Sequence, residues 1–224
     1  MMEINIDGLK IGGDNPCRII AEVAQNHMGD LALAMNYAVQ AKRCGADIVK
    51  FQHHDKNDIR RMKYALTIND HALIKKMCED IGILYLCTPF SMEAARELND
   101  IEVKAFKIGS GQSGDWDFID DIAQFEKPIL VSHKEKLTHV LCNLQFDLIV
   151  DNLKFLNHWA EGYSCHQPNI YTALAAIALG AKVVEKHVIW DKRQICPDQY
   201  VSIDFNELKE LVEAKKQIEE NLWN

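Results

Sequence analysis

Short apolar runs alternate with longer amphipathic stretches along almost the whole chain, and this alternation restricts the possible folds more than any other feature. Eight runs are nearly continuous in apolar character, which is typical of parallel strands covered by helices. The repeated order of strand, helix and strand predicts an α/β protein, and eight strands favour a closed (β/α)8 TIM barrel over an open sheet. The expected strands are Ile19–Val23, Asp47–Gln52, Leu84–Thr88, Ala105–Ile108, Pro128–Ser132, His139–Asn143, Gly162–Cys165 and Lys182–His187.

Six further segments carry apolar residues at helical spacing. Gly45, Gly82 and Gly180 each follow such a segment and precede a strand, where glycine adopts a left-handed cap at little cost. We therefore expect one barrel domain over residues 1–224, with residues 1–17 forming a β-hairpin that closes the floor of the barrel. The expected helices are Asp30–Cys44, Asn69–Ile81 and residues 92–99, 116–125, 171–179 and 204–222.

One unit of the repeat is too short. Only about six residues separate the strand that ends at Ser132 from the strand expected near His139, whereas a parallel crossover normally needs a dozen or more. Either the fifth helix is missing or reduced to a turn, or the sixth strand is misplaced. We take the reduced fifth helix as the prediction.

The composition excludes several classes of protein. The 224 residues include 25 basic and 33 acidic side chains, and the net charge of −8 argues against a nucleic-acid or anionic-membrane partner. No apolar run approaches the 18 or so residues of a membrane helix, and the first residues lack the order of a signal peptide. The seven cysteines include no C-x-x-C pair, so the cytoplasm is the expected compartment.

Two lysines lie inside strongly apolar runs that are expected to be strands. Lys50 and Lys107 would meet helices if they pointed outward, so we expect both in the mouth of the barrel, where a buried ammonium needs a partner. One interpretation is a phosphate or carboxylate site, to which Thr88, Ser110 and Ser132 add hydroxyl donors. The alternative is a pair of structural ion pairs with Glu22 or Glu185.

Two histidines end the last two expected strands. Imidazoles from adjacent strands can bind one divalent ion and leave positions open for substrate, so His166 and His187 are candidate metal ligands. The alternative is two unrelated polar histidines. His53, His54 and His71 are expected to be solvent-facing or to line the mouth, without an assigned role.

In these same segments the chain resembles the sialic acid synthase family, whose enzymes condense phosphoenolpyruvate with amino sugars to make N-acetylneuraminate and related nonulosonic acids. The matching segments follow one another in the order expected for the family over most of the chain. They are Ile19–Val23, Asn26–Asp30, Gly45–Gln52, Cys87–Phe90, Ala105–Gly111, Lys127–Ser132, Gly162–His166 and Ala178–His187.

The resemblance implies a role for each matching residue. The lysines matching Lys50 and Lys107 hold phosphoenolpyruvate together with the hydroxyls of Thr88, Ser110 and Ser132, and His166 and His187 match ligands of a divalent ion, Mn²⁺ or Mg²⁺. The metal would polarise the aldehyde of the open-chain sugar, and the lysines would stabilise the departing phosphate. The other residues expected in the site are Glu22, Gln52 and Asp198 for catalysis, and Gln112, Asn143 and Lys186 for substrate binding.

Several positions differ from the family pattern. His133 stands where the family has threonine, Gln112 where it has an acid, Cys165 where it has aspartate and Gln199 where it has histidine. The family's C-terminal antifreeze-like domain has no counterpart before Asn224, so we expect a homodimer or a partner chain that supplies it. The leading hypothesis is a condensing enzyme acting on small molecules. The alternative is a catalytically impaired barrel that serves as a ligand-binding or partner subunit in polysaccharide biosynthesis.

Overall fold

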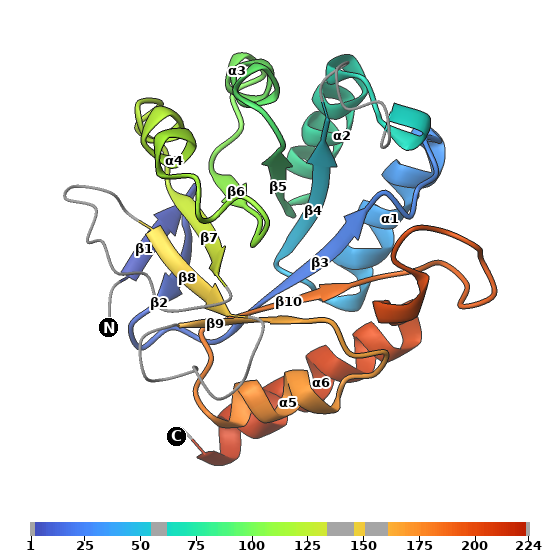
Figure 1. Ribbon diagram of the computed structural model, residues 1–224. Helices are drawn as coiled ribbons and strands as arrows, with labels where there is room; N and C mark the ends of the chain where they lie inside the picture. Colours follow the sequence, from blue (N-terminus) through green and yellow to red (C-terminus); the bar gives the residue numbers. More distant parts are fainter. Residues whose placement is uncertain (1–2, 55–61, 134–145, 151–160, 223–224) are drawn as a thin grey trace.

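A computed structural model describes residues 3–54, 62–133, 146–150 and 161–222, and it shows a closed barrel of eight parallel strands (Figure 1). The strands follow the order β10-β3-β4-β5-β6-β7-β8-β9 around the barrel, so each pairs with its neighbours in the chain and the last pairs with the first. Their bounds are Arg18–Ala24 (β3), Ile48–His53 (β4), Leu84–Pro89 (β5), Phe106–Ile108 (β6), Ile129–His133 (β7), Phe146–Val150 (β8), Gly162–Cys165 (β9) and Val183–His187 (β10).

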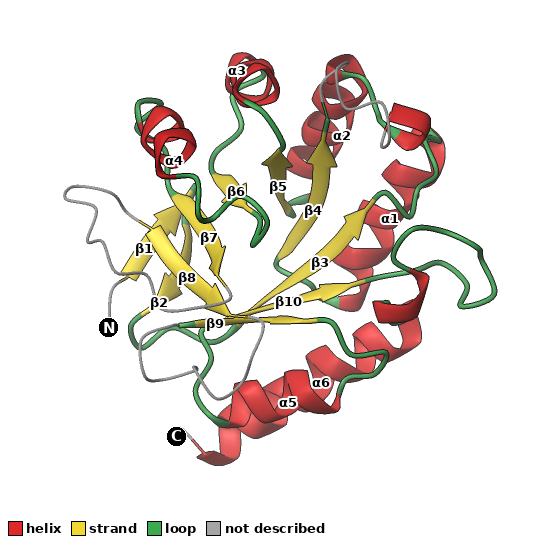
Figure 2. Cartoon of the chain, viewed as in Figure 1, coloured by secondary structure: helices red, strands yellow, loops and turns green. Residues whose placement is uncertain are grey.

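Helices surround the barrel on its outer side (Figure 2), and all six begin and end within two residues of the expected bounds. The sequence sets these ends locally: Asp30 accepts a hydrogen bond from the main-chain N of Leu33 at the start of α1, and Gly45 ends it with φ of +88°. The helices are Leu31–Cys44 (α1), Ile68–Ile81 (α2), Met92–Asp100 (α3), Trp116–Ala123 (α4), Tyr171–Ala178 (α5) and Phe205–Leu222 (α6), with 3₁₀ turns at Met62–Tyr64 (η1) and Gln199–Val201 (η3). None of the helices in the described part of the chain is long and apolar enough to cross a bilayer.

The sixth barrel strand is a correction to the sequence prediction. The strand in that place is β8, which pairs with β7 in a register that sets Leu130 beside Asp147. The expected strand, His139–Asn143, and the expected reduced fifth helix both lie in residues 134–145, outside the described part of the chain. With the strand moved to β8, the connection reaches the length that a parallel crossover needs. The sixth strand had therefore been misplaced.

The N-terminal hairpin closes the floor of the barrel, as predicted. Its strands Glu3–Ile6 (β1) and Leu9–Gly12 (β2) pair antiparallel, and Ile4, Ile6 and Ile11 are at most 1% exposed. These three side chains share one core cluster with Ala105, which directly precedes β6, and with inward residues from five barrel strands: Ile20, Ile48, Leu86, Leu130 and Val183. The apolar plug leaves the opposite, carboxyl-terminal end of the barrel as the open one.

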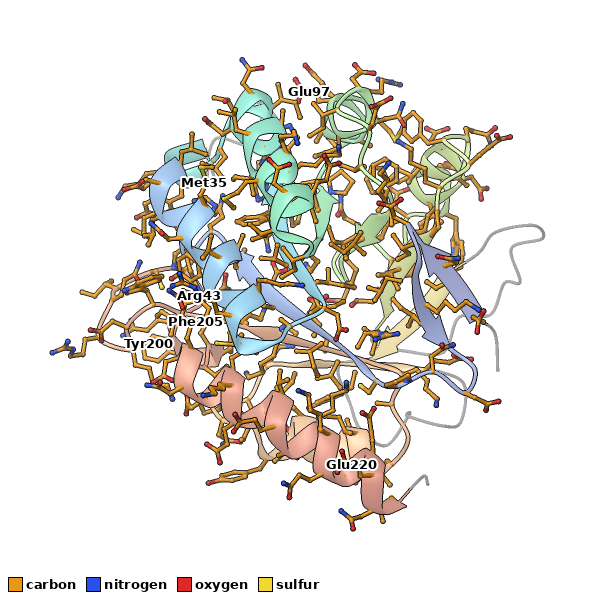
Figure 3. The ribbon with its side chains drawn as sticks, turned by 180° about the vertical axis from the view of Figure 1, so that it is seen from behind. Met35, Arg43, Glu97, Tyr200, Phe205 and Glu220 are labelled. Atoms are coloured by element: carbon orange, nitrogen blue, oxygen red, sulfur yellow. The ribbon has the colours of Figure 1, made fainter. Side chains whose placement is uncertain are left out.

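Three aromatic rings pack together between α1 and the connection from β10 to α6. The ring of Tyr37 lies 6.0 Å from that of Trp190 and 5.7 Å from that of Phe205, and the Tyr37 hydroxyl accepts a hydrogen bond of 2.9 Å from the main-chain N of Trp190. Figure 3 shows Phe205 at the start of α6 beside α1. This contact fixes where the β10–α6 connection leaves the barrel.

Truncation of the plug tests its contribution to stability. We expect Ile11→Ala to lower the free energy of unfolding by about 2–5 kcal/mol, because the change leaves a cavity in a fully buried layer. Ile195→Ala is the matched control, since Ile195 is 86% exposed and its truncation should change stability by no more than about 0.5 kcal/mol. Urea unfolding of both variants checks this, and equal effects would contradict a packed plug.

Candidate active site at the open end of the barrel

Charged and polar side chains from most of the barrel strands gather inside the barrel near its open end. Strand alternation puts every second residue on the inner face, and contacts that span the barrel confirm the direction. Lys107 on β6 lies 3.7 Å from Glu185 on β10, although these strands are not neighbours in the sheet. The inner set, none of it more than 6% exposed, is Glu22, Lys50, Thr88, Lys107, Ser132, Ser164, Glu185 and His187.

Two lysines and two glutamates form a buried charge network at the centre of this set. Lys50 Nζ lies 2.6 Å from Glu22 Oε2 and 3.5 Å from Glu185 Oε1, and Lys107 Nζ lies 3.7 Å from Glu185 Oε2. The ion pairs expected under the structural alternative are therefore present. They do not exclude a bound anion, because both lysines also reach hydroxyls: Lys50 donates to Thr88 Oγ1 at 3.2 Å and Lys107 to Ser132 Oγ at 2.6 Å.

The two glutamates differ in acidity because they share the lysines unequally. Burial raises the pKa of Glu22, and Lys50 offsets only part of that effect, to which the neighbouring Glu185 adds. For Glu185 burial also favours the neutral form, but Lys107 and Lys50 outweigh it and lower its pKa. Glu185 is thus the stronger counter-charge of the two lysines, while Glu22 binds a proton more readily.

His166 and His187 face each other at the rim of the same opening. Their ring centroids are 5.2 Å apart, His187 is buried and His166 is exposed. Burial, and then the neighbouring His166, lower the pKa of His187 to about 3, so its ring is in the neutral form that metals require. His187 Nδ1 is buried without a hydrogen-bond partner and lies 3.9 Å from Asp198 Oδ2.

This donor set fits a divalent ion held by two imidazoles. Nδ1 of His187 is a buried ring nitrogen without a hydrogen-bond partner, and two protein ligands leave other positions open for water or substrate. No group of three or more His, Cys, Asp and Glu residues in the described segments is arranged to hold an ion by itself. The site is therefore suited to an ion that shares its coordination with substrate.

Asp198 is held in place through its main chain. Its N–H donates to Asn26 Oδ1 at 3.2 Å, and its carbonyl accepts from Ser202 Oγ at 2.7 Å. Asn26, which is fully buried, also donates to Ser202 Oγ and to the carbonyl of Val188. The β3–α1 connection thereby fixes the segment that presents the Asp198 carboxylate to the opening.

Comparison with known proteins assigns this architecture to a family. The model of the NeuB family matches residues 58–135 and 143–224, which is well over half of the chain. The chain belongs to the NeuB family. It is 32% identical to the N,N'-diacetyllegionaminic acid synthase of Campylobacter jejuni over 90% of this chain and 76% of that protein. It is 27% identical to the N-acetylneuraminate-9-phosphate synthase of Homo sapiens over 96% of this chain and 74% of that protein.

A solved NeuB-type structure confirms the barrel. The N-acetylneuraminic acid synthetase of Leptospira borgpetersenii, in complex with citrate, superposes with a TM-score of 0.90 at 25% identity and covers 100% of this chain and 90% of that one. The resemblance to sialic acid synthases inferred from the sequence is thus confirmed, as is the (β/α)8 fold.

Most of the predicted site residues converge in the NeuB barrel. Gln52 Nε2 approaches Glu22 Oε1 at 3.5 Å, which extends the charge network toward the rim. Ser110 and Gln112 lie half-buried in the connection after β6, where Gln112 Oε1 is buried without a hydrogen-bond partner. Asn143 lies outside the described residues.

Lys186 is the exception among the predicted residues. It lies between the inward-facing Glu185 and His187, so alternation turns its side chain to the outer face of β10, away from the charge network. Its ammonium donates to the main-chain carbonyls of Cys165, Gln167 and Val201. The structure therefore does not bring Lys186 into the predicted substrate pocket.

Ser164 has no predicted role from the sequence, and Glu185 is predicted there only as an ion-pair partner. Ser164 is 3% exposed and pairs in register with Glu185. The signal that could have found both is alternation, since each stands two residues before a predicted metal ligand on the same strand face.

A second cluster of histidines lies on the outer side of β4, and its burial corrects the expectation that His53 and His71 face solvent or line the mouth. His53 Nε2 lies 2.7 Å from Glu97 Oε2, and His71 Nδ1 lies 2.7 Å from the hydroxyl of Tyr85. The rings of His53 and His71 meet edge to face at 4.8 Å, and His27 is 1% exposed nearby. Burial lowers the pKa of His27 to about 4 and that of His71 well below its usual value.

These buried histidines predict a loss of stability in mild acid. Both rings stay neutral in the folded protein but take up protons near pH 6.5 when it unfolds, so their contribution is complete above pH 7 and falls as the pH drops toward about 4. Each of the two histidines lowers the free energy of unfolding by about 1.4 kcal/mol per pH unit in that range. Between pH 7 and pH 5, the free energy of unfolding should fall by about 2 kcal/mol less in His71→Phe than in the unsubstituted protein. Identical losses in urea unfolding would contradict a neutral, buried His71.

Proposed function

We propose that this NeuB-family chain condenses phosphoenolpyruvate with an N-acetylated aldose to form a sialic-acid-like nonulosonate and releases phosphate. The observation that carries the proposal is the convergence of Lys50 and Lys107 inside the open end of the barrel, each beside a hydroxyl. Two ammonium groups and two hydroxyls at the end of a closed barrel suit a small dianion that carries phosphate and carboxylate groups. The named synthases among the relatives support the same reaction.

The residues of the network would have different roles in the reaction. Lys50, Lys107, Thr88 and Ser132 would bind phosphoenolpyruvate, and the two lysines would stabilise the negative charge that develops as the phosphate departs. The methylene carbon of phosphoenolpyruvate forms a bond with the aldehyde carbon of the sugar, water adds at the carbon that carries the phosphate ester, and that C–O bond breaks. The raised pKa of Glu22 suits it to hold a proton beside the reacting atoms.

His166 and His187 would hold a divalent ion, Mn²⁺ or Mg²⁺, with Asp198 near the sugar. When bound, such an ion supplies Lewis-acid polarisation of the aldehyde oxygen. We also propose a cytoplasmic location, in keeping with the six free cysteines of the described residues, and assembly as a homodimer or with a partner chain.

The reaction can be tested by phosphate release. Phosphoenolpyruvate and Mn²⁺ are supplied with a panel of N-acetylated hexosamines and sugar phosphates, and we expect phosphate to appear only when both phosphoenolpyruvate and one class of sugar are present. If the protein binds phosphoenolpyruvate but releases phosphate with none of the sugars, the proposed enzymatic activity is wrong, and the ligand-binding barrel is favoured.

Removal of one lysine separates a ligand site from a structural ion pair. Lys107→Met keeps much of the packing but loses a charge-assisted hydrogen bond worth roughly 1.5–3 kcal/mol, so the Kd for phosphoenolpyruvate should rise about 10- to 150-fold. The exposed Lys104→Met is the matched control and should leave the Kd unchanged. Calorimetric titration with a melting curve for each variant checks this. An unchanged Kd together with a clearly lowered Tm would contradict the ligand site.

A further inference from the structure

Lys186 is completely buried on the outer face of β10, where an apolar side chain would be the ordinary choice. Its ammonium donates hydrogen bonds to three main-chain carbonyls. The acceptor is Val201 at 2.6 Å, Cys165 at 3.3 Å and, in the third bond, Gln167. No carboxylate of the described residues lies within ion-pair distance of Lys186 Nζ. The three carbonyls therefore satisfy all three donors of the ammonium, and its direct partners are peptide dipoles.

The three carbonyls belong to segments that are far apart in the sequence but carry the rim of the site. Cys165 and Gln167 flank His166, where β9 passes into the connection to α5. Val201 ends the 3₁₀ turn η3, which Asp198 precedes directly. Lys186 itself directly precedes His187 on β10. One ammonium thus ties together the three segments that bear His166, His187 and Asp198.

The segment after β9 returns to the core at Ile170, which is buried. Residues 166–170 form no helix or strand, and His166 and Gln167 are exposed on their side-chain surface. A pair of opposed imidazoles requires a fixed backbone, because a metal tolerates only small errors in ligand position. The bonds from Lys186 to the carbonyls on both sides of His166 supply that restraint.

We propose that Lys186 is a positioning residue, which sets the separation of His166 and His187 and holds the Asp198 segment against them from outside the barrel. The inference rests on the proposed function in one respect, the divalent ion between the two histidines. It replaces the expectation that Lys186 contacts substrate.

The test measures metal affinity and backbone protection in the same variants. Co²⁺ is the probe, because its visible spectrum reports the ligand geometry. Lys186→Met should weaken Co²⁺ binding about 10-fold or more and change the spectrum. Hydrogen exchange should also become faster in residues 165–168 and 198–202 together, while the rest of the barrel keeps its protection. Lys186→Arg retains buried donors and should restore part of both properties.

Lys215→Met is the matched control, since Lys215 is another buried lysine, paired with Glu219 on α6 and remote from the rim. It should leave Co²⁺ affinity and exchange in the two rim segments unchanged even if it lowers Tm. If Lys186→Met binds Co²⁺ like the unsubstituted protein and its rim segments exchange no faster, the positioning role is wrong. If the unsubstituted protein binds no Co²⁺, the proposed metal site fails. Hydrogen exchange in Lys186→Met then decides whether Lys186 holds residues 165–168 and 198–202 together. Faster exchange in both segments supports this role, and unchanged exchange overturns it.

Discussion

The rest of the site depends on two ammonium groups held out of water inside a barrel. Burial of a charge costs several kcal/mol unless partners compensate it, and even well-paired buried ions are often no more stable than apolar side chains of the same size. Lys50 and Lys107 nevertheless lie at most 3% exposed, where Glu185 contacts both and Glu22 contacts only the first. A network that stability alone does not require supports the proposed role of the lysines toward a ligand.

The fold creates this environment by closing one end of the barrel and leaving the other open. The isoleucines of the hairpin fill the floor, and the apolar layer above them separates the charges from solvent on that side. Strand alternation then places each polar inward residue one layer higher, beside the opening. The same geometry suits the proposed anion site in a protein whose net charge is −8, because distant surface charges are screened within about 8–10 Å while the lysines act at contact distance.

The repeated pattern of strand and helix made most of the fold predictable. Apolar runs and helical spacing, with glycine caps at three positions, predicted seven of the eight strands and all six helices, because burial on both faces of a strand leaves a strong signal. The sixth strand was misplaced because two apolar runs, at 139–143 and 146–150, compete for one position and only pairing with β7 decides between them. In the site, the inward position of Lys50 and Lys107 could be predicted, because helices cover the outer face of a barrel strand and leave the barrel mouth for a charged side chain inside an apolar run. Lys186 and His71 could not, since their partners are main-chain carbonyls and a tyrosine hydroxyl that only the tertiary fold brings near.

The central claim is that the buried charges serve a ligand rather than the stability of the barrel. The most direct measurement is equilibrium unfolding in urea, with and without phosphoenolpyruvate, of a variant that combines Glu22→Leu, Lys50→Met, Lys107→Met and Glu185→Leu. We expect the variant to have a free energy of unfolding within about 1 kcal/mol of that of the unsubstituted protein or above it, because apolar side chains of similar volume replace buried ion pairs at little cost. We also expect phosphoenolpyruvate to stabilise only the unsubstituted protein. A variant that is several kcal/mol less stable, with phosphoenolpyruvate stabilising neither protein, would contradict the claim.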